Sequence, residues 1–331
     1  MPKMKTLVLP PETRLSEVCS ERCVQLLNER FDPVWNDKGR DYTPEELAEL
    51  IPEAEVILTS WGSPILTREL LERAGKLQAI GHAAGSLKGR IPSDTFDRGI
   101  KVFSGAQRIA QSVGEYCLGA LLTLLRRLPD FDRGLHQGIW KNGSMRGHEL
   151  KGRTVGLVSA SSTARVFIQL LKPFEVQIKV FDPYLSDQAA EQLQVTRASL
   201  EEIMACPIIS VHAPKLPETY RMLNKSLLQR IPKGAIFINS SRADVLDEEA
   251  LIEELQTGRF LAALDVYVKE PLAPDSPLCS LSNVLLTPHV AGDTVEGRLA
   301  LMEEIVEDIG RSFREEKTKY EISRAVWDRL A

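Results

Sequence analysis

Cysteine is scarce in this sequence, with five residues scattered along 331. An odd number at irregular spacing is typical of reduced thiols and argues against a disulfide framework. Cys19 and Cys23 could share one helix face, but no nearby Cys or His completes a zinc set. We therefore expect ordinary helix positions for both cysteines and no metal site.

Long apolar runs and strong net charge are also missing. No stretch approaches the ~20 apolar residues that a membrane-spanning helix needs. The N-terminus MPKMKTLVLPPE lacks the small-residue cleavage site of a signal peptide. The net charge is only -5, with both signs interspersed and no basic stripe, which argues against nucleic acid as a partner. We expect a cytoplasmic protein that binds neither membrane nor nucleic acid.

An ordinary globular composition is present, with 43% hydrophobic and 26% charged residues over a length that favours two domains. Near the N-terminus, short apolar segments alternate with helical patterns, which predicts strands of a parallel sheet in TLVLP, EVILTSW, LQAIGHA and IKVFSG. The segment SVGEYCLGALLTLLRRL predicts a long helix, apolar on nearly all sides and buried between the domains. A second β-α series then predicts six strands, in GRTVGLVS, VQIKVFDPYLS, PIISVHAP, GAIFINSS, FLAALDVY and NVLLTPHV.

The first turn of the second series, VGLVSASSTARVF, stands where a dinucleotide-binding turn carries three glycines. Ser159, Ser161 and Ala164 occupy those places. Alanine is tolerated at the third place, whereas serine at the first two is a departure. A serine hydroxyl can donate to phosphate, and the following helix offers its free N–H groups and positive end to an anion. The loop alone leaves two interpretations open, a pyrophosphate site or a turn that binds nothing.

The next strand, VQIKVFD, ends in Asp182, about 20 residues on, where dinucleotide-binding folds place an acidic residue. A carboxylate there accepts hydrogen bonds from both ribose hydroxyls and repels a 2′-phosphate. Asp182 therefore favours NAD over NADP.

Three later strand ends each present one reactive side chain: Arg242, Glu270 and His289. They should converge, because the C-terminal edges of parallel strands gather around one crevice. Arginine can hold a carboxylate and polarise a keto oxygen, while histidine can donate a proton to that oxygen as hydride reaches carbon. A glutamate against the imidazole favours its charged form. Singly, each residue also has an ordinary interpretation, as a surface ion pair, a loop residue or a buried histidine.

Together these features resemble the D-isomer-specific 2-hydroxyacid dehydrogenase family. The resemblance covers most of the chain and rests on motifs in the right order: SVGEYCLGALLTLLRR, HELKGRTVGL, VFDPY, VHAPKLPET, GAIFINSSRADVLDEEAL, LDV with EPL, and NVLLTPHVAG. It implies an α/β fold with two doubly wound parallel-sheet domains, usually in a homodimer. A Rossmann-type dinucleotide-binding domain, 106–296, would be inserted in a flavodoxin-like substrate domain, 1–105 and 297–331.

The resemblance also assigns roles. It implies that Arg242 binds substrate, that Glu270 orients the histidine and that His289 is the acid/base. Loop amides of Ser162 and Thr163 would hold the pyrophosphate of NAD, Asp182 the adenosine ribose and Asp265 the nicotinamide carboxamide. The residues implied to contact the cofactor are Ser161, Ser162, Thr163, Asp182, Pro214, Ser240, Ser241 and Asp265.

The segment AAGSLKGRI is a second departure from the family pattern. Backbone amides of Ala84, Gly85 and Ser86 would cradle the substrate carboxylate, although Ser86 replaces a glycine. Lys88 stands where the family has an acid. Lys88 and Arg90 leave two interpretations open, binding of a second anionic group or a solvated loop.

The sequence thus predicts an NAD-dependent oxidoreductase that interconverts a small 2-hydroxy acid and its 2-oxo acid. The alternative is a non-catalytic binding or regulatory protein on the same fold, as the family's corepressor relatives suggest. The altered loop favours that alternative, and the paired Glu and His oppose it, because binding alone does not need them. A catalyst with another nucleotide or weak NAD affinity is a third possibility.

Overall fold

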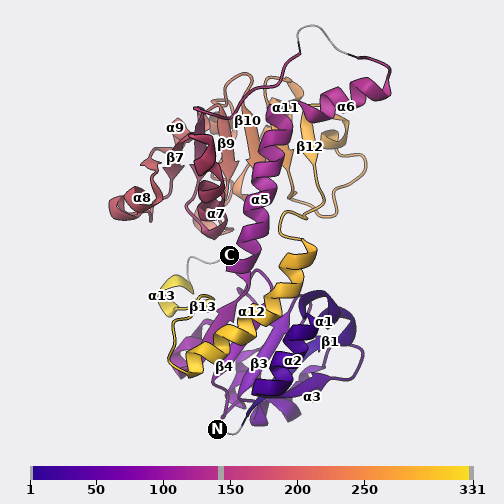
Figure 1. Cartoon of the computed structure of the whole chain (residues 1–331), viewed down its shortest axis with the longest axis vertical. Helices are drawn as coiled ribbons and strands as arrows, with labels where there is room; N and C mark the ends of the chain where they lie inside the picture. The colour runs from indigo at the N-terminus through magenta and orange to yellow at the C-terminus, as the bar shows by residue number, and fades with distance from the viewer. Residues whose placement is uncertain (1–2, 141–144, 328–331) are drawn as a thin grey trace. The chain divides into compact units, whose positions relative to one another are not determined.

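The computed structural model describes residues 3–140 and 145–327 and divides into two compact units. The first comprises Met1–Ile109 and Asp293–Ala331, and the second comprises Ala110–Gly292. Figure 1 shows accordingly that both the N-terminal and C-terminal segments belong to one unit. The chain crosses between units a few residues from the positions expected at 105/106 and 296/297. Helix α5 (Ala106–Leu125) begins in the first unit, and the N-terminal cap of α12 (Val295–Phe313) lies there too.

The first unit is built on a six-stranded sheet with the order β13-β5-β4-β3-β1-β2. Strands β1 to β5 are parallel to one another and lie in the flavodoxin-like order, and β13 is antiparallel to β5. The strands are β1 (Met4–Pro11), β2 (Phe31–Asn36), β3 (Val56–Ser60), β4 (Ala79–Ala83), β5 (Lys101–Ser104) and β13 (Glu321–Ile322). The sequence patterns did not predict β2, an edge strand interrupted by Pro33.

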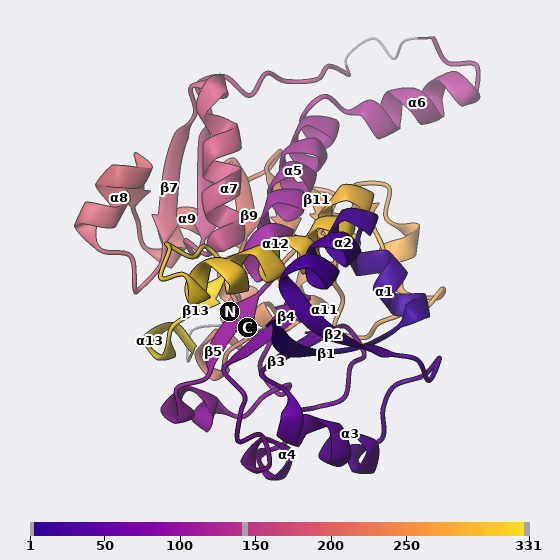
Figure 2. The same ribbon diagram turned by 60° about the horizontal axis from the view of Figure 1, so that its bottom comes forward.

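Helices cover both faces of this sheet, which explains its continuous apolar strands. Leu7 and Leu9 of β1 pack into the core under α3 and α4, whereas Val8 between them packs under α1, α2 and α12. Figure 2 shows these two helical layers on opposite sides of the sheet. The helices are α1 (Glu12–Val18), α2 (Glu21–Arg30), α3 (Pro44–Leu50), α4 (Arg68–Glu72), α12 and α13 (Arg324–Trp327).

The second unit contains a seven-stranded parallel sheet with the order β12-β11-β10-β9-β6-β7-β8. This is the Rossmann-type order, so the predicted fold class is confirmed. The strands are β6 (Thr154–Val158), β7 (Gln177–Phe181), β8 (Thr196–Arg197), β9 (Ile208–Val211), β10 (Ile236–Asn239), β11 (Leu261–Leu264) and β12 (Val284–Leu286). The six expected strands are present, and the two-residue β8 is an addition. The strand order reverses between β6 and β9, which places a ligand crevice at their C-terminal ends.

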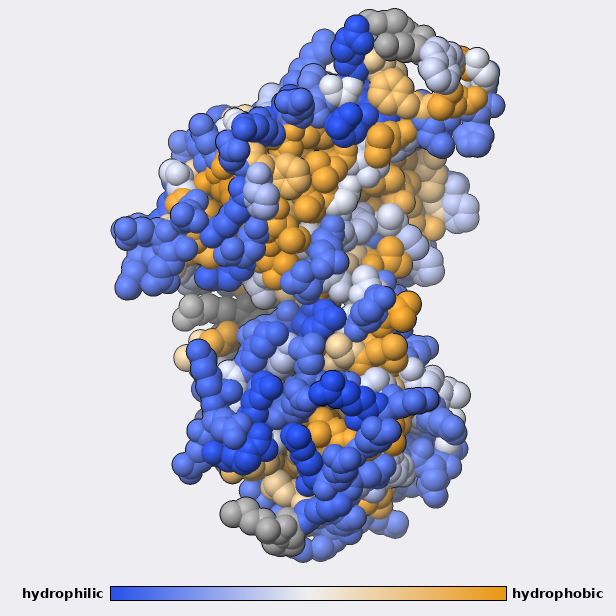
Figure 3. All heavy atoms as spheres, viewed as in Figure 1, coloured by the Kyte–Doolittle hydropathy of each residue, from blue (hydrophilic) through white to orange (hydrophobic). Residues whose placement is uncertain are grey.

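Helices α9, α10 and α11 contribute to the core on one face of this sheet, while α5 and α7 pack together on the other. A Cβ atom on Gly114 of α5 would lie 2.5 Å from Val166 of α7, so only glycine allows this approach. Figure 3 shows hydrophobic residues gathered on the face that carries α5 and α7. The helices are α6 (Leu128–His136), α7 (Ser162–Leu171), α8 (Asp187–Leu193), α9 (Leu200–Met204), α10 (Lys225–Leu228) and α11 (Glu248–Gln256), and short 3-10 turns span Ile51–Glu53, Ser93–Arg98, Lys172–Phe174, Pro217–Thr219, Ala243–Val245 and Pro277–Ser280. Within the described parts of the chain, no helix has the length and apolarity to span a membrane.

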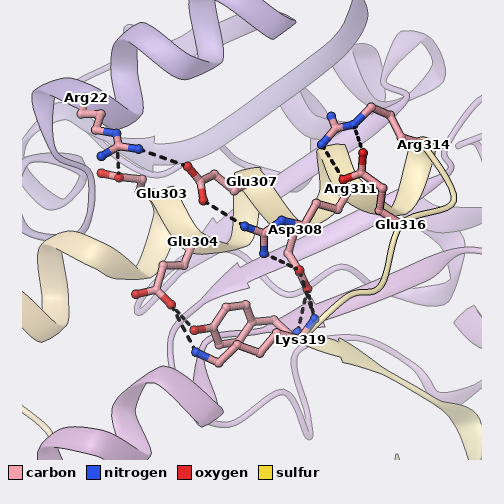
Figure 4. Close-up of polar contacts among 10 residues, drawn as sticks. Arg22, Glu303, Glu304, Glu307, Asp308, Arg311, Arg314, Glu316 and Lys319 are labelled. Carbon is pink, nitrogen blue, oxygen red and sulfur yellow. Dashed lines mark hydrogen bonds and ion pairs between the residues drawn. The ribbon is translucent and has the colours of Figure 1, made fainter.

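The C-terminal segment is anchored to α12 by a buried carboxylate. Asp308 is fully buried and accepts hydrogen bonds from the amides of Lys319 (3.0 and 2.8 Å) and Tyr320 (2.7 Å). The Tyr320 carbonyl in turn accepts from the amide of Ser104 at the end of β5. Figure 4 shows this contact beside the outer ion pairs of Arg22 and Arg314. Asp308 therefore sets the path by which the chain end completes the sheet.

Candidate active site

His289 and Glu270 form a direct pair in the second unit, as predicted from their places at strand ends. Nδ1 of His289 lies 2.8 Å from Oε2 of Glu270, and Oε1 accepts a hydrogen bond from the amide of Tyr267 at 3.0 Å. The His289 side chain remains 48% exposed, and its Nε2 has no hydrogen-bond partner within the described ranges. Its backbone has a φ of 57°, a conformation that is uncommon for residues other than glycine. Nε2 is thus the nitrogen available for proton exchange.

Arg242 follows β10 and interacts electrostatically with Glu270. Burial lowers the pKa of Arg242, against the opposing effect of the carboxylates of Glu270 and Asp244. The guanidinium donates from Nη1 to the Ser241 carbonyl at 2.7 Å and forms no ion pair with any carboxylate of the described residues. A half-buried guanidinium with donors to spare can bind a substrate carboxylate.

Asp265 braces the loop that carries His289. It is fully buried, and its carboxylate accepts from the Thr287 hydroxyl (2.6 Å) and from the amides of Val290 (2.9 Å) and Ala291 (2.8 Å). Because the Thr287 proton goes to Asp265, the hydroxyl of Tyr116, 2.7 Å from Thr287 Oγ1, must be the donor in that contact. The expected contact of Asp265 with the nicotinamide carboxamide stays a prediction.

The sequence patterns did not predict a role for Tyr116 or Thr287. Thr287 lies two residues before His289, but a lone threonine before a proline carries no functional signal. Tyr116 lies on α5, and no local pattern relates it to a loop 171 residues away. Burial raises the pKa of Tyr116 to about 12, which keeps its hydroxyl protonated as the donor.

The serine loop after β6 closes upon Asp182. Ser159 adopts a φ of 79°, and its hydroxyl donates to Asp182 Oδ2 at 3.1 Å. The amide of Ala160 donates to the same oxygen at 2.8 Å, and that of Tyr184 to Oδ1 at 2.8 Å. Two acceptor oxygens offer about four lone pairs, so one remains for a ribose hydroxyl. Asp182 thus fits its expected role only in part while it also holds the turn.

The start of α7 fits a pyrophosphate. Ser161 is the N-terminal cap, but its side chain makes no capping hydrogen bond and instead lies 3.0 Å from the Thr163 hydroxyl. The first amides of α7 are therefore left for an anion, as doubly wound folds require. Below them, His212 is buried, with Nδ1 3.1 Å from Thr163 Oγ1 and Nε2 3.0 Å from Ser210 Oγ. Burial lowers the pKa of His212 to about 3, so the ring is a neutral support for Thr163.

The remaining expected cofactor residues lie in the loops after β9 and β10. The Pro214 carbonyl accepts from the Thr219 hydroxyl at 2.7 Å. Ser240 is buried, with Oγ 3.1 Å from Cys117 Sγ, and the Ser241 hydroxyl donates to Asn239 at 3.0 Å. These side chains therefore shape the loops, and their contacts with a cofactor stay predictions. Among the residues placed in the structure, no cluster of His, Cys, Asp or Glu could hold a metal.

The expected substrate segment, Ala84, Gly85 and Ser86, follows β4 in the first unit. The Gly85 carbonyl accepts from the Ser104 hydroxyl at 3.3 Å. Arg90, beyond the segment, donates to the Ser63 carbonyl at 3.3 Å. Both contacts hold the loop, and neither distinguishes the two interpretations of its basic residues.

The buried imidazole of His82 precedes this segment, with Nδ1 2.8 Å from the Thr59 hydroxyl. Burial, together with the charge of Arg90, lowers the pKa of His82 to about 4. His82 is therefore a neutral residue beneath the loop.

Comparison with known proteins identifies the family of the chain. Residues 118–291 match the family profile described as "D-isomer specific 2-hydroxyacid dehydrogenase, NAD binding domain". A D-3-phosphoglycerate dehydrogenase of Archaeoglobus fulgidus is 32% identical over 267 residues, 80% of this chain and 50% of that protein. A glyoxylate reductase of Korarchaeum cryptofilum is 27% identical over 308 residues, 91% and 92% of the two chains.

Among solved structures, a phosphoglycerate oxidoreductase from Rhizobium etli superposes with a TM-score of 0.84 and 28% identity, covering 97% of this chain and 99% of that one. The chain spans only about half the length of the phosphoglycerate dehydrogenases that it matches. The profile nevertheless covers more than half of the chain. The chain belongs to the D-isomer-specific 2-hydroxyacid dehydrogenase family, and residues 118–291 are its NAD-binding domain.

Proposed function

We propose that the protein is an NAD-dependent dehydrogenase that interconverts a small 2-hydroxy acid and its 2-oxo acid. The observation that carries the proposal is the 2.8 Å pair of His289 and Glu270, with Arg242 in electrostatic contact with Glu270. Among the described residues, Nε2 of His289 has no hydrogen-bond partner and Arg242 has no ion pair. The names of the relatives, a phosphoglycerate dehydrogenase and a glyoxylate reductase, support small hydroxy acids as the substrate class.

Each residue of this group has one role in the mechanism. Bound NAD would supply the acceptor or donor of hydride for the substrate carbon. Arg242 binds the substrate carboxylate and polarises its keto oxygen. Nε2 of His289 takes the hydroxyl proton during oxidation and returns a proton during reduction. Glu270 stabilises the charge that the imidazole then carries.

We assign cofactor binding to the second unit, and substrate binding to Arg242 of that unit together with the segment after β4 in the first unit. The first amides of α7, at Ser162 and Thr163, would hold the pyrophosphate, and Asp182 would bind the ribose through its remaining lone pair. In the first unit, the backbone amides of Ala84, Gly85 and Ser86 would hold the substrate carboxylate.

A titration of the purified chain with NADH, followed by fluorescence, tests the cofactor assignment, with NADPH as the comparison. We expect micromolar binding of NADH and weaker binding of NADPH, because Asp182 repels a 2′-phosphate. A folded protein that binds no NADH would favour the non-catalytic alternative. For the chemistry, His289→Ala should abolish turnover of every 2-oxo acid that the wild type reduces while NADH binding persists. Full turnover by this variant would contradict the assignment.

We further propose a homodimer that buries the hydrophobic face of α5 and α7 together with α6. None of the residues of helix α6 is buried, and Trp140, which follows the helix, is 86% exposed. The apolar residues available for this interface are Leu118, Leu122, Leu128, Leu135, Ile139, Trp140, Val166 and Leu170. Light scattering should give twice the chain mass, and Leu122→Glu should give the monomer. A monomeric wild type at micromolar concentration would overturn the dimer.

The free thiols agree with a cytoplasmic location, which we also propose. Four cysteines are buried and Cys279 is exposed, all unpaired. An exposed free thiol is typical of a reducing compartment. Fractionation of cells that express the chain tests the location.

A further inference from the structure

A cavity lies at the N-terminal edge of the second unit's sheet, opposite the C-terminal edge that carries His289. It encloses about 150 Å³, room for several water molecules or a small anion. Arg153, immediately before β6, and Arg259, shortly before β11, line it together with Arg127 beyond the end of α5. We call this space the basic cavity.

The charged side chains that line the basic cavity are three arginines. Besides the three arginines the lining includes His148, and no aspartate or glutamate is among its described residues. Two of the three arginines form ion pairs, Arg127 with Asp130 and Arg259 with Glu254. Apolar side chains such as Leu124 and Phe260 form part of the wall, so charges there are screened less than at an open surface.

The three guanidinium groups are held in place and still have donors to spare. Nε of Arg127 bonds to Asp130 at 2.5 Å, and Nε of Arg153 donates to the Glu149 carbonyl at 2.6 Å. Arg259 uses Nε and Nη2 for Glu254, at 3.0 and 2.8 Å. The two terminal nitrogens of Arg127 and of Arg153, and Nη1 of Arg259, have no hydrogen-bond partner in the part of the chain that the structure describes.

We propose that the basic cavity binds an oxyanion of the phosphate class, either inorganic phosphate or the phosphate group of a small metabolite. Guanidinium forks match the oxygens of phosphate, and anchored arginines lose little freedom on binding. The site is separate from that of His289, so its ligand is neither the substrate nor the cofactor. A bound anion joins the end of α5 to the starts of β6 and β11 and thereby stabilises the second unit.

Equilibrium dialysis of the full chain against radiolabelled inorganic phosphate tests the proposal, at ionic strength held constant with NaCl. A parallel arm contains saturating NADH, because the start of α7 could also hold phosphate. We expect one phosphate to remain bound in the NADH arm. Arg153→Gln should weaken its binding at least tenfold, and Arg127→Gln should do the same. The matched control is Arg230→Gln, an exposed arginine of the same unit outside the cavity, which should bind as the wild type does.

Three results would overturn the proposal. The first is that Arg153→Gln and Arg127→Gln bind phosphate as tightly as Arg230→Gln does. The second is that NADH displaces phosphate completely, which would locate it at α7. The third is that the wild type binds none at millimolar concentration. If phosphate binds, displacement of the bound label by glycerol 3-phosphate, which has no carboxylate for Arg242, is compared with displacement by unlabelled phosphate. This separates a phosphorylated metabolite from free phosphate, since the physiological source should displace the label at the lower concentration.

Discussion

The proposed chemistry depends on the contact between His289 and Glu270. Burial raises the pKa of Glu270, but the hydrogen bonds with His289 and the Tyr267 amide, together with the charges of His289 and Arg242, outweigh burial and give a net lowering. Glu270 is therefore an anion at neutral pH, and it lies in hydrogen-bond contact with Nδ1 of His289, the proposed proton donor in reduction of a 2-oxo acid.

Replacing Glu270 with Gln should move the pH dependence of reduction. Without the anion, a proton on the imidazole loses its counter-charge, so we expect the pH above which kcat/KM for 2-oxo acid reduction declines to fall. The profile is measured from pH 5 to 10. Glu249→Gln, at an exposed position on α11, is the matched control and should leave the profile in place. An unchanged profile for Glu270→Gln would remove Glu270 from this role.

Ser159 offers a second test at the level of one residue. Its φ of 79° costs a serine about 1–2 kcal/mol relative to glycine, whereas its hydroxyl bonds to Asp182. Ser159→Gly and Ser159→Ala both remove the hydroxyl, but only glycine relieves the strain. We expect the glycine variant to be about 1–2 kcal/mol more stable than the alanine variant in urea unfolding. Equal stabilities would show that the turn is not strained.

Ser159→Gly should also bind NADH several-fold more tightly than the wild type does, because one lone pair of Asp182 becomes free for the ribose. The fluorescence titration measures this affinity. Weaker binding by the glycine variant would indicate that the serine hydroxyl itself contacts the cofactor.

At the scale of elements, the His289 loop is positioned by a strand end and a helix. Asp265 follows β11, and Tyr116 lies on α5, and both act through Thr287. The sequence patterns predicted these elements and placed Arg242, Glu270 and His289 at neighbouring strand ends. They did not predict the hydrogen bonds of Thr287 with Asp265 and Tyr116, since hydroxyl contacts between residues far apart in the sequence leave no periodic signal.

The hydrogen bonds of Thr287 can be tested by their effect on turnover. Thr287→Val removes both the donor to Asp265 and the acceptor for Tyr116, and we expect kcat to fall about tenfold with little change in KM, since small displacements of a catalytic group are costly. Thr287→Ser keeps the hydroxyl and should restore most of the rate. If valine and serine lowered kcat equally, the methyl packing of Thr287 would matter and the hydroxyl would not.

At the scale of the whole molecule, each unit contains one buried neutral histidine. Burial lowers the pKa of His212 to about 3 and, together with the charge of Arg90, that of His82 to about 4, from an ordinary value of 6.5. Below pH 6.5 the unfolded chain binds protons that the folded units exclude. The stability that depends on these neutral histidines is therefore fully present above pH 6.5, and it is lost as the pH falls toward their lowered pKa values.

We expect the free energy of unfolding to fall with decreasing pH in this window, and each histidine to contribute up to about 1.4 kcal/mol per pH unit to that slope. Urea unfolding at pH 7.5, 6 and 5 measures the slope. His82→Asn and His212→Asn should each flatten it, whereas His136→Asn, at an exposed position, should not. If His82→Asn and His212→Asn both kept the full pH dependence of stability, that dependence would belong to other groups.

The sequence by itself determined the alternation of strands and helices, the parallel sheets with apolar strands buried on both faces, and the reactive residues at strand ends. These features follow from local spacing, because periodicity decides which face of an element is buried. Only the tertiary structure decided that Asp182 holds the serine turn, that Asp265 is shielded beneath the His289 loop, and that arginines surround a cavity at the opposite edge of the sheet. Such contacts depend on atomic positions set by the packing of distant segments, which spacing along the chain does not encode.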